Sequence, residues 1–329
     1  MKIYATPSWA KSLLTLLTWK RFATPFNFTM GALLAVLLLA DIVLARAVHL
    51  SGWSVYLDIW FGLLLISVCW FYCLLRPLPR LIDAVEVSLW ACLLNNALSA
   101  LILIAGRTPR PLVDRGLCMI DGKMHFSTEY FVHLAAYAPV AQIILAVSYP
   151  LLGPMVIVAL LALPFFGYTH AARRFVLATT LAVIFTAALF ALWPAAGPWI
   201  TENITPSKDQ INVTAHLIRL KSSAPLDVDL KDAAIVSFPS FHVALAILTA
   251  VALGSFRRLR IWMWILTVMI CISTITTGWH YGIDVLGGLA VAALSFALAG
   301  LLKEAPTLPS AAPHDSQSSN PPPAESPAL

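Results

Sequence analysis

The sequence is dominated by apolar runs that are long enough to cross a lipid bilayer. A spanning helix needs about 20 apolar residues, and such runs lie near 30–48, 53–75, 83–105, 175–194, 241–256, 260–278 and 281–301. Of all residues 60% are hydrophobic and 11% are charged, which is too apolar for a soluble chain of this length. Since a bilayer has no water to bind backbone groups, the runs predict an all-α polytopic membrane protein.

The stretch between Phe126 and Tyr168 is apolar enough for two crossings, yet Pro139, Pro150 and Pro154 interrupt it and can instead kink one long helix. One crossing, from about 139 to 168, gives about eight spans and places the basic groups on one side of the membrane. These groups are Lys11, Lys20, Arg21, Arg76, Arg80, Arg173, Arg174, Arg257, Arg258, Arg260 and Lys303. Two crossings would split them between the two sides.

The positive-inside rule therefore favours one crossing, with both termini in the cytoplasm. In this arrangement residues 112–138 form a short helix on the outer surface. The same distribution argues against nucleic acid as a partner. The net charge is +5, but the Lys and Arg residues stand in short groups between apolar runs and do not gather on one face.

A first candidate for chemistry is the segment from Ser237 to His242, which directly precedes the apolar run Val243 to Leu253. Serine followed by proline is typical of a helix start. A helix N-terminus presents free backbone N–H groups and the positive end of the helix dipole. The segment therefore predicts a place where a phosphate can bind.

A second candidate lies at the start of the last apolar run, where His280 precedes Asp284 by four residues. This spacing puts both side chains on one helical face, so the carboxylate can accept the proton of one imidazole nitrogen and leave the other electron-rich. That is the arrangement of an activated nucleophile. An acid inside a membrane span also needs a partner, because an unpaired one is costly there.

The predicted topology brings the two candidates together. The span that follows His242 ends at the Arg257 group, and the next span returns to end at His280. Both histidines are thus expected on one face of the membrane, the extracytoplasmic face by the charge rule. A single histidine at a helix end is usually a hydrogen-bonding residue, whereas two such residues with an acid and a phosphate-binding helix start favour an active site.

These residues resemble known signatures. Pro239-Ser240-Phe241-His242, together with Ser273, His280 and Asp284 in that spacing, is similar to the second and third signatures of the type-2 phosphatidic acid phosphatase (PAP2) superfamily. Trp279-His280-Tyr281-Gly282-Ile283-Asp284 and the upstream Trp193 to Pro198 resemble its inositol phosphorylceramide synthase branch. The resemblance covers roughly residues 110 to 300.

The resemblance implies roles for these residues. His280 would attack phosphorus and become a transient phosphohistidine, Asp284 would orient it, and His242 would act as general acid and then general base. Ser240 and nearby backbone amides would hold phosphoryl oxygens. The family requires no metal, and no metal-ligand cluster or cofactor motif is visible in the sequence.

The chain departs from the family pattern at basic positions. Thr274 stands where the third signature usually has Arg, and Leu103 stands where the first has Lys, seven positions before Arg110-Pro111. The synthase-like branch also lacks these residues. Since a transferred phosphate needs counter-charges, we expect Arg107 and Arg110 to approach it, with loop cations as further candidates. These are Lys208, Arg219, Lys221 and Lys231.

The sequence thus predicts N-terminal transmembrane helices over 1–105, a catalytic membrane domain over 106–302 and a disordered cytoplasmic tail over 303–329. The predicted function is transfer of a phosphate-linked group from a phospholipid or lipid phosphate to a lipid alcohol. The alternative is a lipid phosphate phosphatase with water as acceptor. A non-enzymatic transporter or scaffold is a third interpretation, disfavoured because His242, His280 and Asp284 are all present.

Overall fold

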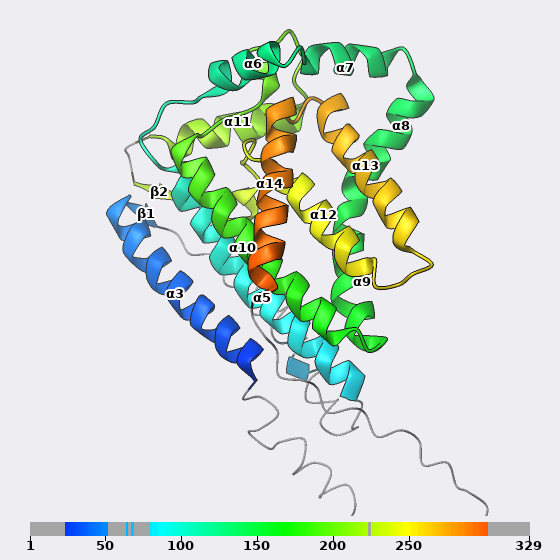
Figure 1. Cartoon of the computed structure of the whole chain (residues 1–329). Coiled ribbons are helices and arrows are strands. Elements are labelled where there is room, and N and C mark those ends of the chain that lie inside the picture. Colours follow the sequence, from blue (N-terminus) through cyan, green and yellow to red (C-terminus); the bar gives the residue numbers. More distant parts are fainter. Residues whose placement is uncertain (1–23, 52–63, 65–66, 69–78, 223–224, 302–329) are drawn as a thin grey trace, which may run out of the picture.

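The computed structural model describes residues 24–51, 64, 67–68, 79–222 and 225–301 (Figure 1). Over these residues the protein is all-α, apart from one parallel pair of two-residue strands. The elements, in chain order, are α3 (Pro25–Ala47), β1 (Leu50–Ser51), α5 (Pro79–Gly106), α6 (Asp114–Lys123), α7 (Thr128–Ala136), α8 (Pro139–Ser148), η1 (Tyr149–Leu151), α9 (Leu152–Phe165), α10 (Thr169–Leu192), η2 (Pro198–Ile200), α11 (Lys208–Leu220), β2 (Leu226–Asp227), η3 (Leu230–Ala233), α12 (Phe241–Leu253), α13 (Arg260–Thr276) and α14 (Gly282–Ala299).

Five of the described helical segments are long and apolar enough to cross a membrane. They are α3, most of α5, the run from α8 to α9, α10 and α14. Helices α12 and α13 are shorter and also apolar. The protein is therefore a polytopic membrane protein. The predicted span at 53–75 lies largely outside the described residues, as does the tail at 303–329, so the count of eight spans stays a prediction.

The proline-rich stretch forms one candidate span from Pro139 to Phe165, as the one-crossing interpretation expects. Pro139 lies in the first turn of α8, and Pro154 lies near the start of α9, where a missing backbone N–H costs little. Pro150 lies in the short turn η1 that joins the two helices. The prolines thus begin helical segments and do not end the crossing.

Residues 112–138 do not form the single surface helix that the sequence predicted. They form two helices, α6 and α7, which lie with α11 at one end of the bundle (Figure 1). The break has a local cause. His125 has a left-handed φ of 56°, and the Ser127 side chain accepts a hydrogen bond from the Tyr130 N–H, which starts α7.

The core of the bundle is built around α10, which packs against α5, α12 and α14. Small residues on α10, such as Ala178 and Ala182, are fully buried and let neighbouring helices approach closely. The same hydrophobic cluster includes Phe26 and Met30 of α3. The N-terminal helices therefore share one core with the helices that carry the histidines. The domain boundaries at 105 and 302 stay predictions.

Helices α12, α13 and α14 run alternately up and down (Figure 1). The start of α12 and the start of α14 consequently lie at the end of the bundle that is covered by α6, α7 and α11. The turn between α12 and α13 lies at the opposite end, where Phe256 contacts Phe166 and Tyr168 of the turn between α9 and α10. This topology places His242 and His280 at the same end.

Candidate active site

Helix α12 begins immediately before His242, and Ser240 caps it. The Ser240 hydroxyl accepts a hydrogen bond from the Val243 N–H at 3.4 Å. The Ser240 N–H donates to the backbone carbonyl of Asp284 at 3.0 Å, which ties the start of α12 to the start of α14. The ring of His242 stacks on Tyr149 of η1, with centroids 4.5 Å apart and planes 18° apart. The orientation of this imidazole is therefore fixed by packing.

His280 and Asp284 form the side-chain pair that the spacing of four predicted. His280 Nδ1 lies 3.2 Å from Asp284 Oδ2, and the aspartate is fully buried. The same Oδ2 accepts hydrogen bonds from the Ser237 hydroxyl at 2.9 Å and the Tyr281 N–H at 3.0 Å. With Nδ1 facing the carboxylate, the other ring nitrogen, Nε2, is left for an external partner.

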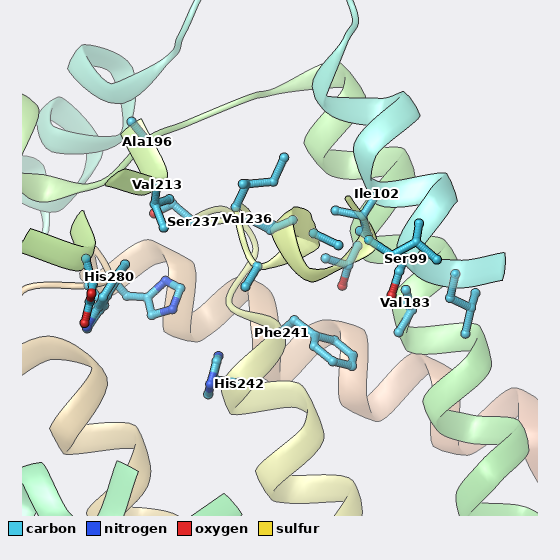
Figure 2. A pocket seen from close by; sticks show the side chains of 18 of the residues that line it. Ser99, Ile102, Val183, Ala196, Val213, Val236, Ser237, Phe241, His242 and His280 are labelled. Atoms are coloured by element: carbon cyan, nitrogen blue, oxygen red, sulfur yellow. The ribbon is translucent and has the colours of Figure 1, made fainter. Parts of the chain in front are cut away.

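Both histidines line one cavity of about 580 Å³. Figure 2 shows His242, His280 and Ser237 toward one side of this cavity, and Ser99, Ile102 and Val183 toward the other. Phe241 and Val236 lie between the two groups. The lining is Asn95, Leu98, Ser99, Ile102, Tyr149, Val183, Thr186, Ala196, Asp209, Val213, Leu230, Ala233, Ala234, Ile235, Val236, Ser237, Phe241, His242, Trp279 and His280. A largely apolar cavity with a few polar groups suits a lipid.

The start of α14 is held by carboxylates of the surface helix α6. Asp121 accepts hydrogen bonds from the Gly282 and Ile283 N–H groups through its two oxygens. Asp114 accepts from the Ala196 and Gly197 N–H groups and lies 3.3 Å from the Tyr281 hydroxyl. Burial raises the pKa of both carboxyl groups, and these hydrogen bonds oppose the rise. Helix α6 thus fixes the position of Tyr281, which directly follows His280.

Glycines allow α14 to approach the loop before α12. A Cβ atom at Gly288 would overlap the Ser240 carbonyl oxygen, and one at Gly287 would come within 3.0 Å of Pro239. Both contacts involve the loop that carries Ser237 and Ser240. The small residues at 287 and 288 therefore permit the close approach that brings Asp284 into reach of Ser237.

The other predicted site residues lie away from the cavity lining. Ser240 is fully buried, and its hydroxyl is the cap of α12. Arg107 is buried and donates hydrogen bonds to the carbonyls of Val48 at 2.9 Å and Leu220 at 3.1 Å. Arg110 is exposed, and its carbonyl accepts from Lys221. Among the side chains described at the cavity wall, none is Lys or Arg.

The sequence interpretation missed Asp114, Asp121 and Ser237. The two aspartates are seven residues apart on α6, which places them on one helical face two turns apart. This spacing could have indicated that the two aspartates act on the same neighbour. The segment was predicted only to lie on the outer surface. Ser237 belongs to the quoted segment, but its sequence context does not distinguish it from Ser240.

We expect Asp121→Asn to destabilise the site end of the bundle by about 1–3 kcal/mol, because one of two partly buried N–H groups at the start of α14 would lose its acceptor. Thermal unfolding in detergent measures this as a lower Tm. Asp232→Asn is a suitable control, since the Asp232 side chain is 43% exposed. Equal melting temperatures of Asp121→Asn and the unmodified protein would show that the α6 contact does not hold α14.

Over the described residues, no group of three or more His, Cys, Asp and Glu side chains is placed to hold a metal ion. The arrangement that is present is a buried imidazole–carboxylate pair with a second imidazole on the same cavity. Such a pair can act as a nucleophile, and the second imidazole can carry a proton. The prediction that no metal or cofactor takes part stays a prediction.

A comparison with known protein families gave a match. A family model described as the PAP2 superfamily matches residues 115–298, a range that contains both histidines, Asp284 and all of the surface helix α6 except its first residue, Asp114. Neither the search of curated proteins nor the search of solved structures gave a significant match.

Proposed function

Since this chain belongs to the PAP2 superfamily, whose members are typically phosphatases or phosphotransferases, we propose that it is a membrane-embedded lipid phosphotransferase. It acts on a phospholipid or lipid phosphate through a phosphohistidine at His280. The main support is the placement of two histidines on one largely apolar cavity, with one of them paired to a buried carboxylate.

In the first half-reaction His280 Nε2 attacks phosphorus and forms a P–N bond while the bond from phosphorus to the leaving oxygen breaks. His242 gives its proton to that oxygen, so the leaving group departs as a neutral alcohol. Asp284 stabilises the positive charge on the His280 imidazole, which is 3.2 Å from its carboxylate. Ser237 holds the carboxylate in place.

In the second half-reaction the acceptor alcohol loses its proton to His242, and its oxygen attacks phosphorus. The P–N bond breaks, and the His280 imidazole returns to its starting state. His242 has then regained the proton that it donated. One residue thus serves as acid and base in turn, as a double displacement requires.

The negative charge of the phosphate needs partners close to the two histidines. The N–H groups of Phe241 and His242, directly after Ser240 in the first turn of α12, are the nearest backbone donors by sequence and support a phosphate at this place. Ser240 caps this helix start and remains a proposed ligand for a phosphoryl oxygen. Arg107 and Arg110 remain proposed ligands for the phosphate. To reach it, Arg107 must leave its hydrogen bonds to the carbonyls of Val48 and Leu220.

The end of the bundle that carries His242 and His280 is proposed to face the extracytoplasmic side. Arg173 and Arg174 lie near the start of α10, and Arg257 lies in the turn before α13, at the end of the bundle opposite to the histidines. Cytoplasmic placement of these arginines agrees with the positive-inside rule. The substrate would then reach the cavity from the outer leaflet of the membrane.

The finer proposal is an activity like that of inositol phosphorylceramide synthases, with a lipid alcohol as acceptor. The alternative is a lipid phosphate phosphatase, in which water takes the place of that alcohol. The synthase-like version is favoured by the sequence Trp279 to Asp284 and by the absence of basic residues at the family's usual positions.

The acceptor is tested with a phospholipid labelled in its phosphate. The purified protein is incubated with this donor alone and with ceramide, diacylglycerol or polyprenol. We expect the label to appear in a new lipid only when an acceptor is present. Release of water-soluble labelled phosphate under all conditions, without a new lipid, would reject the transferase and leave the phosphatase.

A further inference from the structure

The cavity extends well beyond the histidines, to a side wall formed by α5 and α10. Helix α5 contributes Asn95, Leu98, Ser99 and Ile102, and α10 contributes Val183 and Thr186. Figure 2 shows Ser99, Ile102 and Val183 gathered there, across Phe241 from His242. Helix α5 lies outside the range matched by the family model. We call this part of the cavity, lined by these six residues, the α5–α10 arm.

The α5–α10 arm contains a hydroxyl group without a hydrogen-bond partner among the described residues. Thr186 is 1% exposed, and its Oγ1 makes no hydrogen bond within the described part of the chain. By contrast, the hydroxyls of Thr180 on α10 and Thr249 on α12 donate to the carbonyl four residues earlier, at 2.9 and 2.7 Å. A buried hydroxyl without a partner is costly, and since Thr186 lines the cavity, a ligand atom bound there can supply the partner.

Two further polar side chains share the arm. Asn95, Ser99 and Ile102 are three or four residues apart on α5 and therefore project from one face. Thr186 follows Val183 by three residues on α10. The arm thus combines hydroxyl and amide donors with the aliphatic side chains of Leu98, Ile102 and Val183. A ligand group that fits both the polar donors and the aliphatic side chains is a carbonyl oxygen attached to a hydrocarbon chain.

We propose that the α5–α10 arm binds the acyl carbonyl region of the lipid substrate, with Thr186 and Ser99 donating hydrogen bonds to ester or amide carbonyl oxygens. This proposal rests on the proposed function, because it assigns the lipid whose phosphate lies at His280. It narrows the substrate class to lipids whose chains are linked through carbonyl groups. Polyprenyl and ether-linked lipids lack these acceptors.

The arm can be tested with two lipids that differ only in the carbonyl groups. These are dioctanoylglycerol phosphate, a diester, and the corresponding dioctylglycerol phosphate, a diether. Equilibrium binding of each radiolabelled lipid is measured on purified protein in detergent, in the His280→Ala background so that no turnover occurs. We expect tighter binding of the diester, by about 3- to 10-fold for each hydrogen bond that the arm supplies.

Thr186→Val and Ser99→Ala should each weaken diester binding by about 3- to 10-fold and leave diether binding unchanged. Thr179→Val is the matched control, because Thr179 lies two turns earlier on α10, also has a buried hydroxyl without a partner, and does not line the cavity. This control should not change the ratio between the two lipids. Thermal unfolding of each variant confirms that it is folded.

Equal binding of the diester and the diether by the His280→Ala protein, without further substitutions, would overturn the proposal. If Thr186→Val and Ser99→Ala weakened the binding of both lipids equally, the proposal would also be overturned. Such a result indicates a change in packing, which does not distinguish the diester from the diether. Because binding is measured without turnover, the result is independent of catalysis. A preserved diester preference in a protein that transfers no phosphate would reject the proposed function and retain the lipid site.

Discussion

His280→Ala is expected to lower the rate of phosphate transfer by about 10⁴-fold or more, because the variant lacks the only atom that forms the P–N bond. His242 is not expected to replace it. His242 stacks on Tyr149, and no carboxylate pairs with it among the described contacts. The variant should fold, since a smaller side chain at the cavity wall removes no hydrogen bond other than the one to Asp284.

The measurement is transfer of labelled phosphate from lipid, together with acid-labile, alkali-stable labelling of the protein as the sign of phosphohistidine. A matched control is His216→Ala. His216 also faces an aspartate, with Nδ1 3.5 Å from Asp232 Oδ2, but neither residue lines the cavity. We expect this control to keep full activity and labelling. Persistent labelling in His280→Ala would falsify the assignment of the nucleophile.

Much of the arrangement could be predicted from local patterns. The lengths of the apolar runs predicted α3, α10, α12, α13 and α14 to within a few residues, apart from earlier starts of α3 and α10, because span length is set by the bilayer. The spacing of His280 and Asp284 predicted their contact, because it depends only on helix geometry. The alternating direction of the spans sufficed to bring His242 to the same end of the bundle.

What could not be predicted depends on contacts between distant segments. Asp121 binds the start of α14 across a sequence separation of 161 residues, and although its spacing from Asp114 places both on one helical face, that spacing does not identify the distant partner. Arg107 seemed available to a phosphate, yet the fold surrounds it with the carbonyls of Val48 and Leu220. The contribution of α5 to the cavity likewise follows from its packing on α10, which hydropathy alone does not specify.

The second large effect is expected for His242→Ala, which should slow transfer from a lipid substrate by about 10²- to 10⁴-fold. A lipid alkoxide is a poor leaving group, so the first half-reaction needs the proton that His242 supplies. The second half-reaction needs His242 as base for the acceptor. Steady-state transfer with labelled lipid phosphate measures the loss, and an effect within a factor of two would remove His242 from the mechanism.

A substrate with an activated leaving group separates the two duties of His242. With p-nitrophenyl phosphate the first half-reaction needs no acid, because nitrophenolate leaves readily, whereas the second still needs a base. His242→Ala should therefore release about one equivalent of nitrophenolate rapidly and then turn over slowly, with phosphohistidine accumulating on His280. Stopped-flow absorbance and protein labelling measure the burst. Rapid turnover without a burst would show that another group activates the acceptor.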